Sequence, residues 1–138
     1  MSQRRVLVVD DEPRILDIVK YFLEQGGYQV EAVTSGEKAL AAARRDVFDI
    51  AVLDIVLVND SGYEVAGKLK KLKNAEKLPV LFMSSKVEMA DLFIENFEGR
   101  AEFLLKPFKK EALLEAIRNL LEGGGRQAHK SGARARRK

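Results

Sequence analysis

The residues that decide the fold read RVLVVDDEP and occupy positions 5–13. Residues 6–9 form an unbroken apolar run, which is typical of a strand buried on both faces. Strands of this kind occur in parallel sheets, because helices cover both faces of such a sheet. The run stops at three acids, residues 10–12, so the strand is expected to deliver carboxylates to one edge of the sheet.

A helical pattern follows this strand, and strand and helix signals then alternate along the chain. The first helix is expected over residues 13–25, and its predicted inner stripe is Ile15, Ile18, Val19 and Phe22. Further strands are expected at 28–33, 48–53, 80–83 and 101–105. Further helices are expected to open at Lys109 and at three capping-box patterns, Thr34 with Glu37, Ser61 with Glu64, and Ser85 with Glu88.

Five strands alternating with five helices predict an α/β fold. The expected architecture is a parallel five-stranded sheet with helices on both faces and the strand order 2-1-3-4-5. This is the flavodoxin-like doubly wound (βα)5 arrangement. In such sheets ligands bind beyond the carboxyl ends of the strands, so the residues there are the first candidates for a site.

Composition excludes several kinds of chemistry. The 138 residues contain no Cys, which excludes disulfides, thiolate catalysis and cysteine metal sites. The single histidine, His129, lies in a polar C-terminal stretch and is typical of a solvated tail residue rather than of a metal ligand or triad base. No apolar run is long enough for a membrane span or a signal-peptide core, and we expect a cytoplasmic location.

The basic residues are concentrated at the C-terminus. Residues 124–138 hold six of them and no acid, so the overall charge of +3 leaves −3 for residues 1–123. The glycines at 123–125 mark the end of one predicted domain, 1–123, followed by a basic tail, 124–138, that is expected to be disordered. The tail is a candidate contact for an acidic partner, whereas no basic patch for nucleic acid is expected on the folded domain.

Polar residues stand where four of the predicted strands end. Asp10 and Asp11 follow the first strand, Asp54 the third, Ser84 the fourth and Lys106 the fifth. Taken singly, each has an ordinary interpretation as a loop residue or a helix cap. Taken together, they all fall at the same end of their strands, and the predicted topology brings them to one edge.

Such a cluster suits phosphoryl transfer. Neighbouring carboxylates repel one another, and a Mg²⁺ ion would remove that conflict because it prefers oxygen ligands and binds through one or two carboxylates. A lysine ammonium and a serine hydroxyl would hold phosphoryl oxygens, over which the negative charge spreads. Asp54 is then the candidate nucleophile that becomes an aspartyl phosphate.

Four segments resemble the signature motifs of response-regulator receiver domains. They occur in the order and spacing of that family, and the resemblance covers residues 3–122. It implies a two-component signalling protein organised as a stand-alone, chemotaxis-type receiver. The segments are VVDDEP at 8–13, Leu53-Asp54 with Gly62, FMSS at 82–85, and FLLKPF at 103–108.

The resemblance implies a role for each residue at this edge. Asp54 would accept a phosphoryl group from the phosphohistidine of a sensor histidine kinase, and Ser84 and Lys106 would hold the phosphoryl oxygens. Phe103 would be a rotating switch aromatic, and the Lys106-Pro107 bond is expected to be cis. The protein would then not be an enzyme but a phosphoacceptor that promotes its own phosphotransfer and dephosphorylation and docks a partner protein.

The resemblance also implies a magnesium site. Asp11, Asp54 and the backbone carbonyl of Val56 would bind Mg²⁺ directly, and Asp10 would act largely through a bound water. The chain departs from the family pattern nearby, with Val58 in place of a usual Pro, Ser61 in place of a polar residue such as Asp, Ser84 where Thr is commoner, and Ser85 where Ala or Gly is usual. These changes affect loop geometry and phosphoryl lifetime more than the core chemistry.

Two enzyme classes fit less well, and one non-enzymatic alternative stays open. A haloacid-dehalogenase-type phosphatase needs a second acid two residues after the nucleophile, where this chain has Val56, and no glycine-rich nucleotide-binding motif is present. The alternative is a degenerate receiver that docks partners without phosphorylation. We expect no DNA-binding domain after residue 121, and the kinase and the downstream target are not indicated by the sequence.

Overall fold

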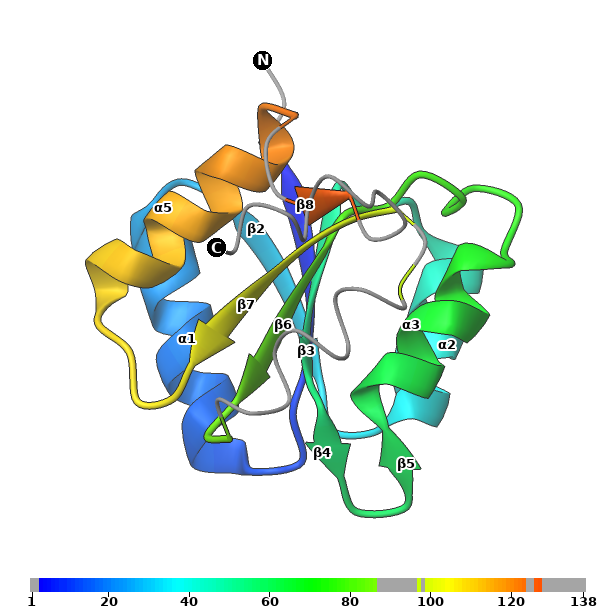
Figure 1. Ribbon diagram of the computed structural model, residues 1–138, viewed down its shortest axis with the longest axis horizontal. Helices are drawn as coiled ribbons and strands as arrows, with labels where there is room; N and C mark the ends of the chain where they lie inside the picture. Colours follow the sequence, from blue (N-terminus) through cyan, green and yellow to red (C-terminus); the bar gives the residue numbers. More distant parts are fainter. Residues whose placement is uncertain (1–2, 87–96, 98, 124–125, 128–138) are drawn as a thin grey trace.

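Parallel strands at the centre of the fold follow the order predicted from the sequence (Figure 1). The order β2-β1-β3-β6-β7 corresponds to 2-1-3-4-5, so the prediction of a flavodoxin-like doubly wound sheet is confirmed. The computed structural model describes residues 3–86, 97, 99–123 and 126–127. The parallel strands are β1 (Arg5–Val9), β2 (Gln29–Val33), β3 (Ile50–Asp54), β6 (Val80–Ser84) and β7 (Arg100–Leu105).

Helices cover both faces of this sheet, as Figure 1 shows. In the described part of the chain they are α1 (Pro13–Gln25), α2 (Gly36–Arg45), α3 (Gly62–Lys70) and α5 (Lys110–Leu121). The helix predicted from the Ser85 and Glu88 pattern lies largely outside the described residues. None of the described helices has the length and apolar character needed to cross a bilayer.

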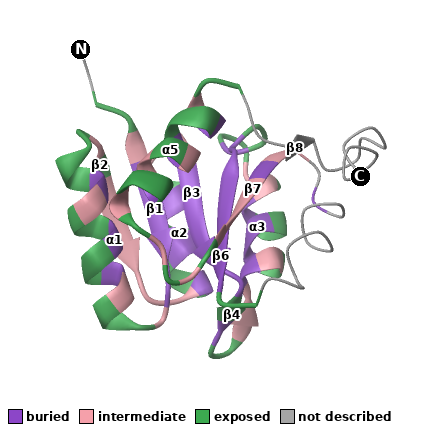
Figure 2. Cartoon of the chain, turned by 60° about the vertical axis from the view of Figure 1, so that its left-hand side comes forward, coloured by how far each residue is buried: buried purple, intermediate pink, exposed green. Residues whose placement is uncertain are grey.

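Alternate residues of each strand belong to two separate apolar clusters. In β1, Leu7 and Val9 pack with α2 and α3, whereas Val6 and Val8 pack with α1 and α5. Figure 2 shows the result, with buried strands in the middle and exposed residues on the outer sides of the helices. Burial of one such side chain contributes roughly 1.5–3 kcal/mol relative to exposure, so the doubly covered sheet anchors the fold.

Two strand pairings were not predicted. β4 (Val56–Leu57) and β5 (Asp60–Ser61) form a small antiparallel sheet just after β3, and β8 (Arg126–Gln127) pairs antiparallel with the start of β7. The second pairing takes two residues of the predicted tail, Arg126 and Gln127, into the sheet. β7 would otherwise leave unpaired backbone groups at the sheet edge, and such groups accept a strand of almost any sequence.

Two local predictions in the helices were wrong. The cap of α2 is Ser35, whose hydroxyl accepts a hydrogen bond from the Lys38 backbone N–H, so the helix begins one residue later than the Thr34 pattern predicted. In α1 the buried residues are Leu16, Val19 and Leu23, whereas Ile18, which was assigned to the inner stripe, is 46% exposed. The apolar pattern of α1 is wider than one stripe, which is why it did not decide the face.

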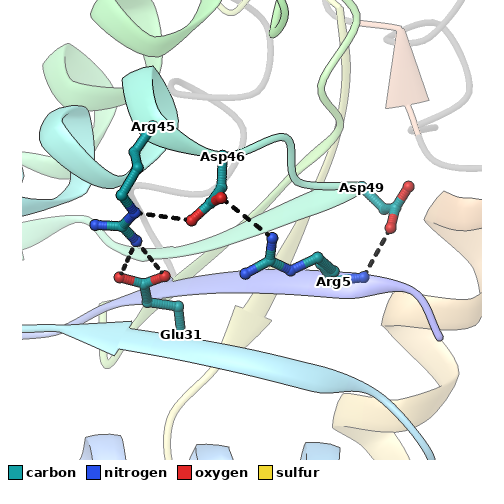
Figure 3. Close-up of polar contacts among 5 residues, drawn as sticks. All are labelled: Arg5, Glu31, Arg45, Asp46 and Asp49. Carbon is teal, nitrogen blue, oxygen red and sulfur yellow. Dashed lines mark hydrogen bonds and ion pairs between the residues drawn. The ribbon is translucent and has the colours of Figure 1, made fainter. Parts of the chain in front are cut away.

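Charged side chains tie β2 and β1 to the end of α2 and to its connection with β3 (Figure 3). The Arg45 guanidinium contacts Glu31 of β2 at 2.6 Å and Asp46 at 2.8 Å. Asp46 also lies 3.7 Å from the Arg5 guanidinium, and the Arg5 backbone N–H donates to Asp49 at 2.7 Å. The network fixes the position at which the chain enters β3, the strand that ends in Asp54.

Candidate functional site

The carboxyl ends of β1, β3, β6 and β7 meet at one edge of the sheet, toward the bottom of Figure 1, beside the β4–β5 hairpin. Parallel pairing sets this arrangement, because Val9 is registered with Leu53, Asp54 with Met83, and Ser84 with Leu105. Each candidate residue therefore ends a strand or follows one, and these strand ends lie at the same level. The sequence predicted this convergence, and the sheet produces it.

Lys106 joins carboxylates from two different strands. Its Nζ lies 2.9 Å from Oδ2 of Asp10 and 3.0 Å from Oδ2 of Asp54. Asp10 is fully buried and Asp54 is 7% exposed, so neither carboxylate has bulk water as its main partner. Charges this far from water require compensation, and the lysine ammonium provides it.

Asp11 completes a cluster of three carboxylates. One oxygen each from Asp10, Asp11 and Asp54 lies within 4.8 Å of the others. This spacing and an all-oxygen donor set fit a small hard cation such as Mg²⁺, which binds through carboxylates and retains several waters. The residues present therefore fit the ion that the sequence predicted. Asp11 is half-buried, which leaves one side of the cluster accessible.

Burial and charge shift the pKa values of two groups in the site. Burial raises the pKa of Asp54 above its ordinary value of 3.8, the hydrogen bond from Lys106 lowers it, and the charge of Asp10 raises it again. Burial by itself would lower the pKa of Lys106, but the hydrogen bonds to Asp10 and Asp54 and the charges of these groups outweigh it, so the pKa is raised from 10.5. Lys106 therefore stays cationic at neutral pH, facing a carboxylate whose charge is only partly compensated.

The backbone around Asp54 is held on two sides. The Val56 N–H donates to Oδ1 of Asp54 at 3.0 Å, which orients the carboxylate and leaves Oδ2 to Lys106. The Ile55 N–H donates to the Met83 carbonyl at 2.9 Å, and the Gly62 N–H donates to the Ile55 carbonyl at 2.7 Å. These bonds fix the turn that leads from β3 into β4.

Ser84 lies at the end of β6 and is buried, with 2% of its surface exposed. Its hydroxyl accepts a hydrogen bond from the Lys86 backbone N–H at 3.0 Å. Its carbonyl accepts one from the Lys106 backbone N–H at 2.8 Å, so Ser84 and Lys106 are joined through the main chain. The predicted cis peptide bond between Lys106 and Pro107 is confirmed.

Phe103 and Val56 occupy different surroundings. Phe103 of β7 is half-buried, is registered with Phe82 and packs against the apolar cluster under α2 and α3. Val56 lies in β4, with its side chain 58% exposed and its N–H directed at Asp54.

A groove beside Lys106 was not predicted. It has a volume of about 290 Å³ and is lined mainly by apolar side chains of α1 and of the connection from β7 to α5. The only sequence signal for it was the excess of apolar residues in α1. The lining residues are Ile15, Ile18, Ser85, Lys106, Pro107 and Phe108.

Comparison with known proteins gives a consistent picture. A family model described as a response regulator receiver domain matches residues 6–118. The response regulator SaeR of Staphylococcus aureus (strain USA300) is 34% identical over 116 residues, which make up 84% of this chain and 50% of SaeR. The chain thus spans about half the length of the curated relatives that it matches.

Solved structures share the fold. A CheY-like response regulator receiver domain protein from Methanospirillum hungatei JF-1 superposes with a TM-score of 0.77 and 32% identity, covering 88% of this chain and 95% of that one. The response regulator protein TrrA from Thermotoga maritima, in complex with Mg²⁺-BeF, gives a TM-score of 0.75 and 31% identity, covering 86% and 99%.

Proposed function

Because the chain belongs to the family of response regulator receiver domains, which are signalling switches of two-component systems, we propose that Asp54 is its phosphoacceptor. The observation that carries this proposal is the contact of one lysine, Lys106, with both Asp10 and Asp54. A receiver that only docks partners has no need for a buried carboxylate of raised pKa held between a lysine and two further acids.

The proposed step transfers a phosphoryl group from a phosphohistidine of a sensor histidine kinase. Oδ2 or Oδ1 of Asp54 forms a bond to phosphorus, the phosphorus–nitrogen bond breaks, and its electron pair stays on the donor imidazole. Lys106 holds a phosphoryl oxygen as the charge spreads over the group, and Ser84 donates its hydroxyl hydrogen to another. The main chains that carry these two side chains are joined through the Lys106 N–H and the Ser84 carbonyl.

Asp10, Asp11 and Asp54 would hold a Mg²⁺ ion, with the backbone carbonyl of Val56 as a further ligand. Bound there, the ion would supply positive charge that offsets the carboxylates and the phosphoryl oxygens. TrrA, one of the similar structures, contains Mg²⁺. The close spacing of the three acids supports the same ion in this chain.

The groove beside Lys106 is the proposed docking place of the phosphodonor. Its apolar lining includes Ile18, which is exposed although it is a large aliphatic side chain. An apolar groove next to the reacting group fits a helix of a partner protein that has to bring a phosphohistidine to Asp54. Donor recognition and phosphoryl transfer would then use adjacent surfaces.

Phosphorylation is proposed to move Ser84 and Phe103 together. Ser84 ends β6 and Phe103 lies in the adjacent β7, where it pairs with Phe82. A shift of Ser84 toward the phosphoryl group would change the packing under Phe103, and two discrete arrangements of this kind make a switch. The downstream target would be a partner protein that binds the changed surface.

The test is labelling with a small phosphodonor, acetyl phosphate, in the presence of Mg²⁺. Intact-mass spectrometry should show one phosphoryl group on the wild-type chain and none on Asp54→Asn, which keeps the shape of the side chain. Asp60→Asn, in the neighbouring hairpin, serves as the matched control and should still be labelled. Equal labelling of Asp54→Asn would refute the assignment, and no labelling of the wild-type chain would favour the degenerate receiver.

A further inference from the structure

Five lysines gather at the end of α3 and in the connection from α3 to β6. They lie within residues 68–77, which contain one acid, Glu76, and which we call the lysine segment. This local excess of positive charge is not apparent from the net charge of −3 over residues 1–123. The lysines are Lys68, Lys70, Lys71, Lys73 and Lys77.

The lysine segment is held rigidly by the core. The backbone N–H groups of residues 72, 75 and 78 each donate to the carbonyl three residues earlier. Leu69, Ala75 and Leu78 are buried, and Leu72 packs against the same cluster, so every third residue faces inward. The side chains between them point outward, and four of the lysines are exposed. These four are Lys68, Lys71, Lys73 and Lys77.

The four exposed lysines form no ion pair with any residue that the structure describes. Lys70 differs, because its Nζ donates to the Leu78 carbonyl at 3.2 Å and lies 5.6 Å from the Phe97 ring centre. Basic residues in the last turn of a helix stabilise its C-terminus, which accounts for Lys68. The effect fades beyond that turn, so it does not account for Lys73 or Lys77.

The lysine segment lies at the edge of the sheet where β7 begins. A Cβ added to Gly99 would lie 2.8 Å from the Lys70 Nζ, so the lysine segment adjoins the start of β7. In Figure 1 the α3–β6 connection lies at the top, and the β4–β5 hairpin lies at the bottom. The lysine segment is therefore opposite the candidate phosphorylation site.

We propose that the lysine segment forms a nucleic-acid-binding surface that contacts the phosphate backbone without reading sequence. Duplex DNA carries a charge about every 1.7 Å, so several ammonium groups on one ordered segment find phosphate partners in any register. The backbone that carries the lysines is already ordered, so binding costs the freedom of the side chains but little backbone freedom. The surface acts independently of phosphotransfer.

A membrane surface fits the same residues less well. Stable attachment to anionic lipid takes a second signal, either buried apolar side chains or an acyl chain, in addition to charge. None of the large hydrophobic residues found exposed in the described chain lies within the lysine segment. The exposed side chains of the lysine segment are thus charged or polar, and this character suits a polyanion.

The test is fluorescence anisotropy of a short labelled DNA duplex of arbitrary sequence, titrated with the full 138-residue chain at several salt concentrations. The variant replaces Lys68, Lys71, Lys73 and Lys77 by Gln. It should bind at least about tenfold more weakly at low salt, and the slope of log K against log salt should become shallower by about two to four. The matched control replaces four lysines elsewhere by Gln, which removes the same charge. These are Lys20, Lys38, Lys109 and Lys110.

Three results would overturn the proposal. The first is no binding of the duplex by the wild-type chain, and the second is an equal loss of affinity in the two quadruple variants. The third is tighter binding of the chain to vesicles of phosphatidylserine and phosphatidylcholine than to DNA. The second result would mean that only net charge matters, and the third would assign the surface to a membrane. Circular dichroism melting of both variants verifies the fold, since exposed Lys→Gln changes usually alter stability by no more than about 0.5 kcal/mol.

Discussion

Gly62 lies against the main chain of Asp54 so closely that a Cβ on residue 62 would be 2.0 Å from the Asp54 carbonyl oxygen. The same Cβ would be 2.9 Å from the Cα of Ile55. Both contacts are with backbone, which cannot move aside by changing a rotamer. The position of the candidate phosphoacceptor is thus coupled to the absence of a side chain at the start of α3.

Gly62→Ala should therefore displace the turn after β3. We expect a loss of about 1–3 kcal/mol or more in the free energy of unfolding, as for other overpacked sites, together with slower labelling by acetyl phosphate. Gly67→Ala is the control within the same helix, because its Cβ meets nothing within 4 Å. That change should raise stability by roughly 0.5–1 kcal/mol, since Ala is the better helix former. Urea denaturation measures both, and a neutral Gly62→Ala would contradict the steric argument.

Asp54→Asn should be more stable than the wild-type chain at neutral pH without Mg²⁺. Burial raises the pKa of Asp54, which means that the fold disfavours the ionised form and a neutral amide avoids that penalty. Lys106 keeps Asp10 as its partner in the variant. Mg²⁺ should then stabilise the wild-type chain and have a much smaller effect on Asp54→Asn. Thermal melts with and without Mg²⁺ measure both effects, and equal Mg²⁺ stabilisation would remove Asp54 from the ligand set.

The network in Figure 3 predicts a pH effect of the opposite sign. The hydrogen bond from Arg45 lowers the pKa of Asp46 below 3.8, so the ionised form contributes stability that is fully present above that pH. The contribution is lost as the pH falls through the lowered folded-state value. Asp46→Asn should therefore be less stable than wild type at pH 7, and the difference should shrink at the acidic end of a pH series.

Asp17→Asn is the control for this series. Asp17 is exposed and makes no ion pair with any residue in the described part of the chain. Its substitution should leave the pH dependence of the unfolding free energy unchanged. An equal pH dependence for Asp46→Asn and wild type would show that the Arg45 contact adds nothing to stability.

Ile18→Ala should separate donor docking from chemistry. The side chain lines the groove beside Lys106, so its removal should slow phosphotransfer from a kinase, with a cost of about 1–3 kcal/mol if Ile18 is a central contact. Labelling by acetyl phosphate, which needs no docking, should stay the same. Val47→Ala removes an exposed apolar side chain in the connection between α2 and β3 and is the matched control. If kinase transfer is unaffected by Ile18→Ala, the donor docks elsewhere.

The sheet and the convergence of the site residues could be predicted, because both follow from a sequence pattern that recurs at each strand. Apolar runs that end in a polar residue, at 6–9 and again at 80–83, define strands and their carboxyl ends at once. Parallel order then brings Asp10 near Lys106, 96 residues further along the chain. The pattern predicts that these residues lie at the same edge of the sheet. It does not predict the contact between Asp10 and Lys106, because the distance between two side chains depends on the register of the strands.

The features that were missed depend on surroundings rather than on local pattern. Arg126 and Gln127 are polar, and they pair because the edge of β7 is available. The β4–β5 hairpin has two residues in each strand, too few for any periodicity. Isoleucine side chains are usually buried, so the sequence did not predict that Ile18 is exposed. This exposure follows from the orientation of α1 on the sheet.

The separation of charge along the strands makes this domain an electric dipole. Carboxylates gather where the strands end at one edge, and the lysine segment lies at the opposite edge. The electric field of a charged partner approaching from solution would orient the domain before contact. The acidic end would face cations, and the basic end would face anions. A phosphoryl group on Asp54 would add negative charge at the end that is already negative. Phosphorylation would thus increase the dipole moment without turning its axis, and would favour more strongly one orientation in which the domain meets its neighbours.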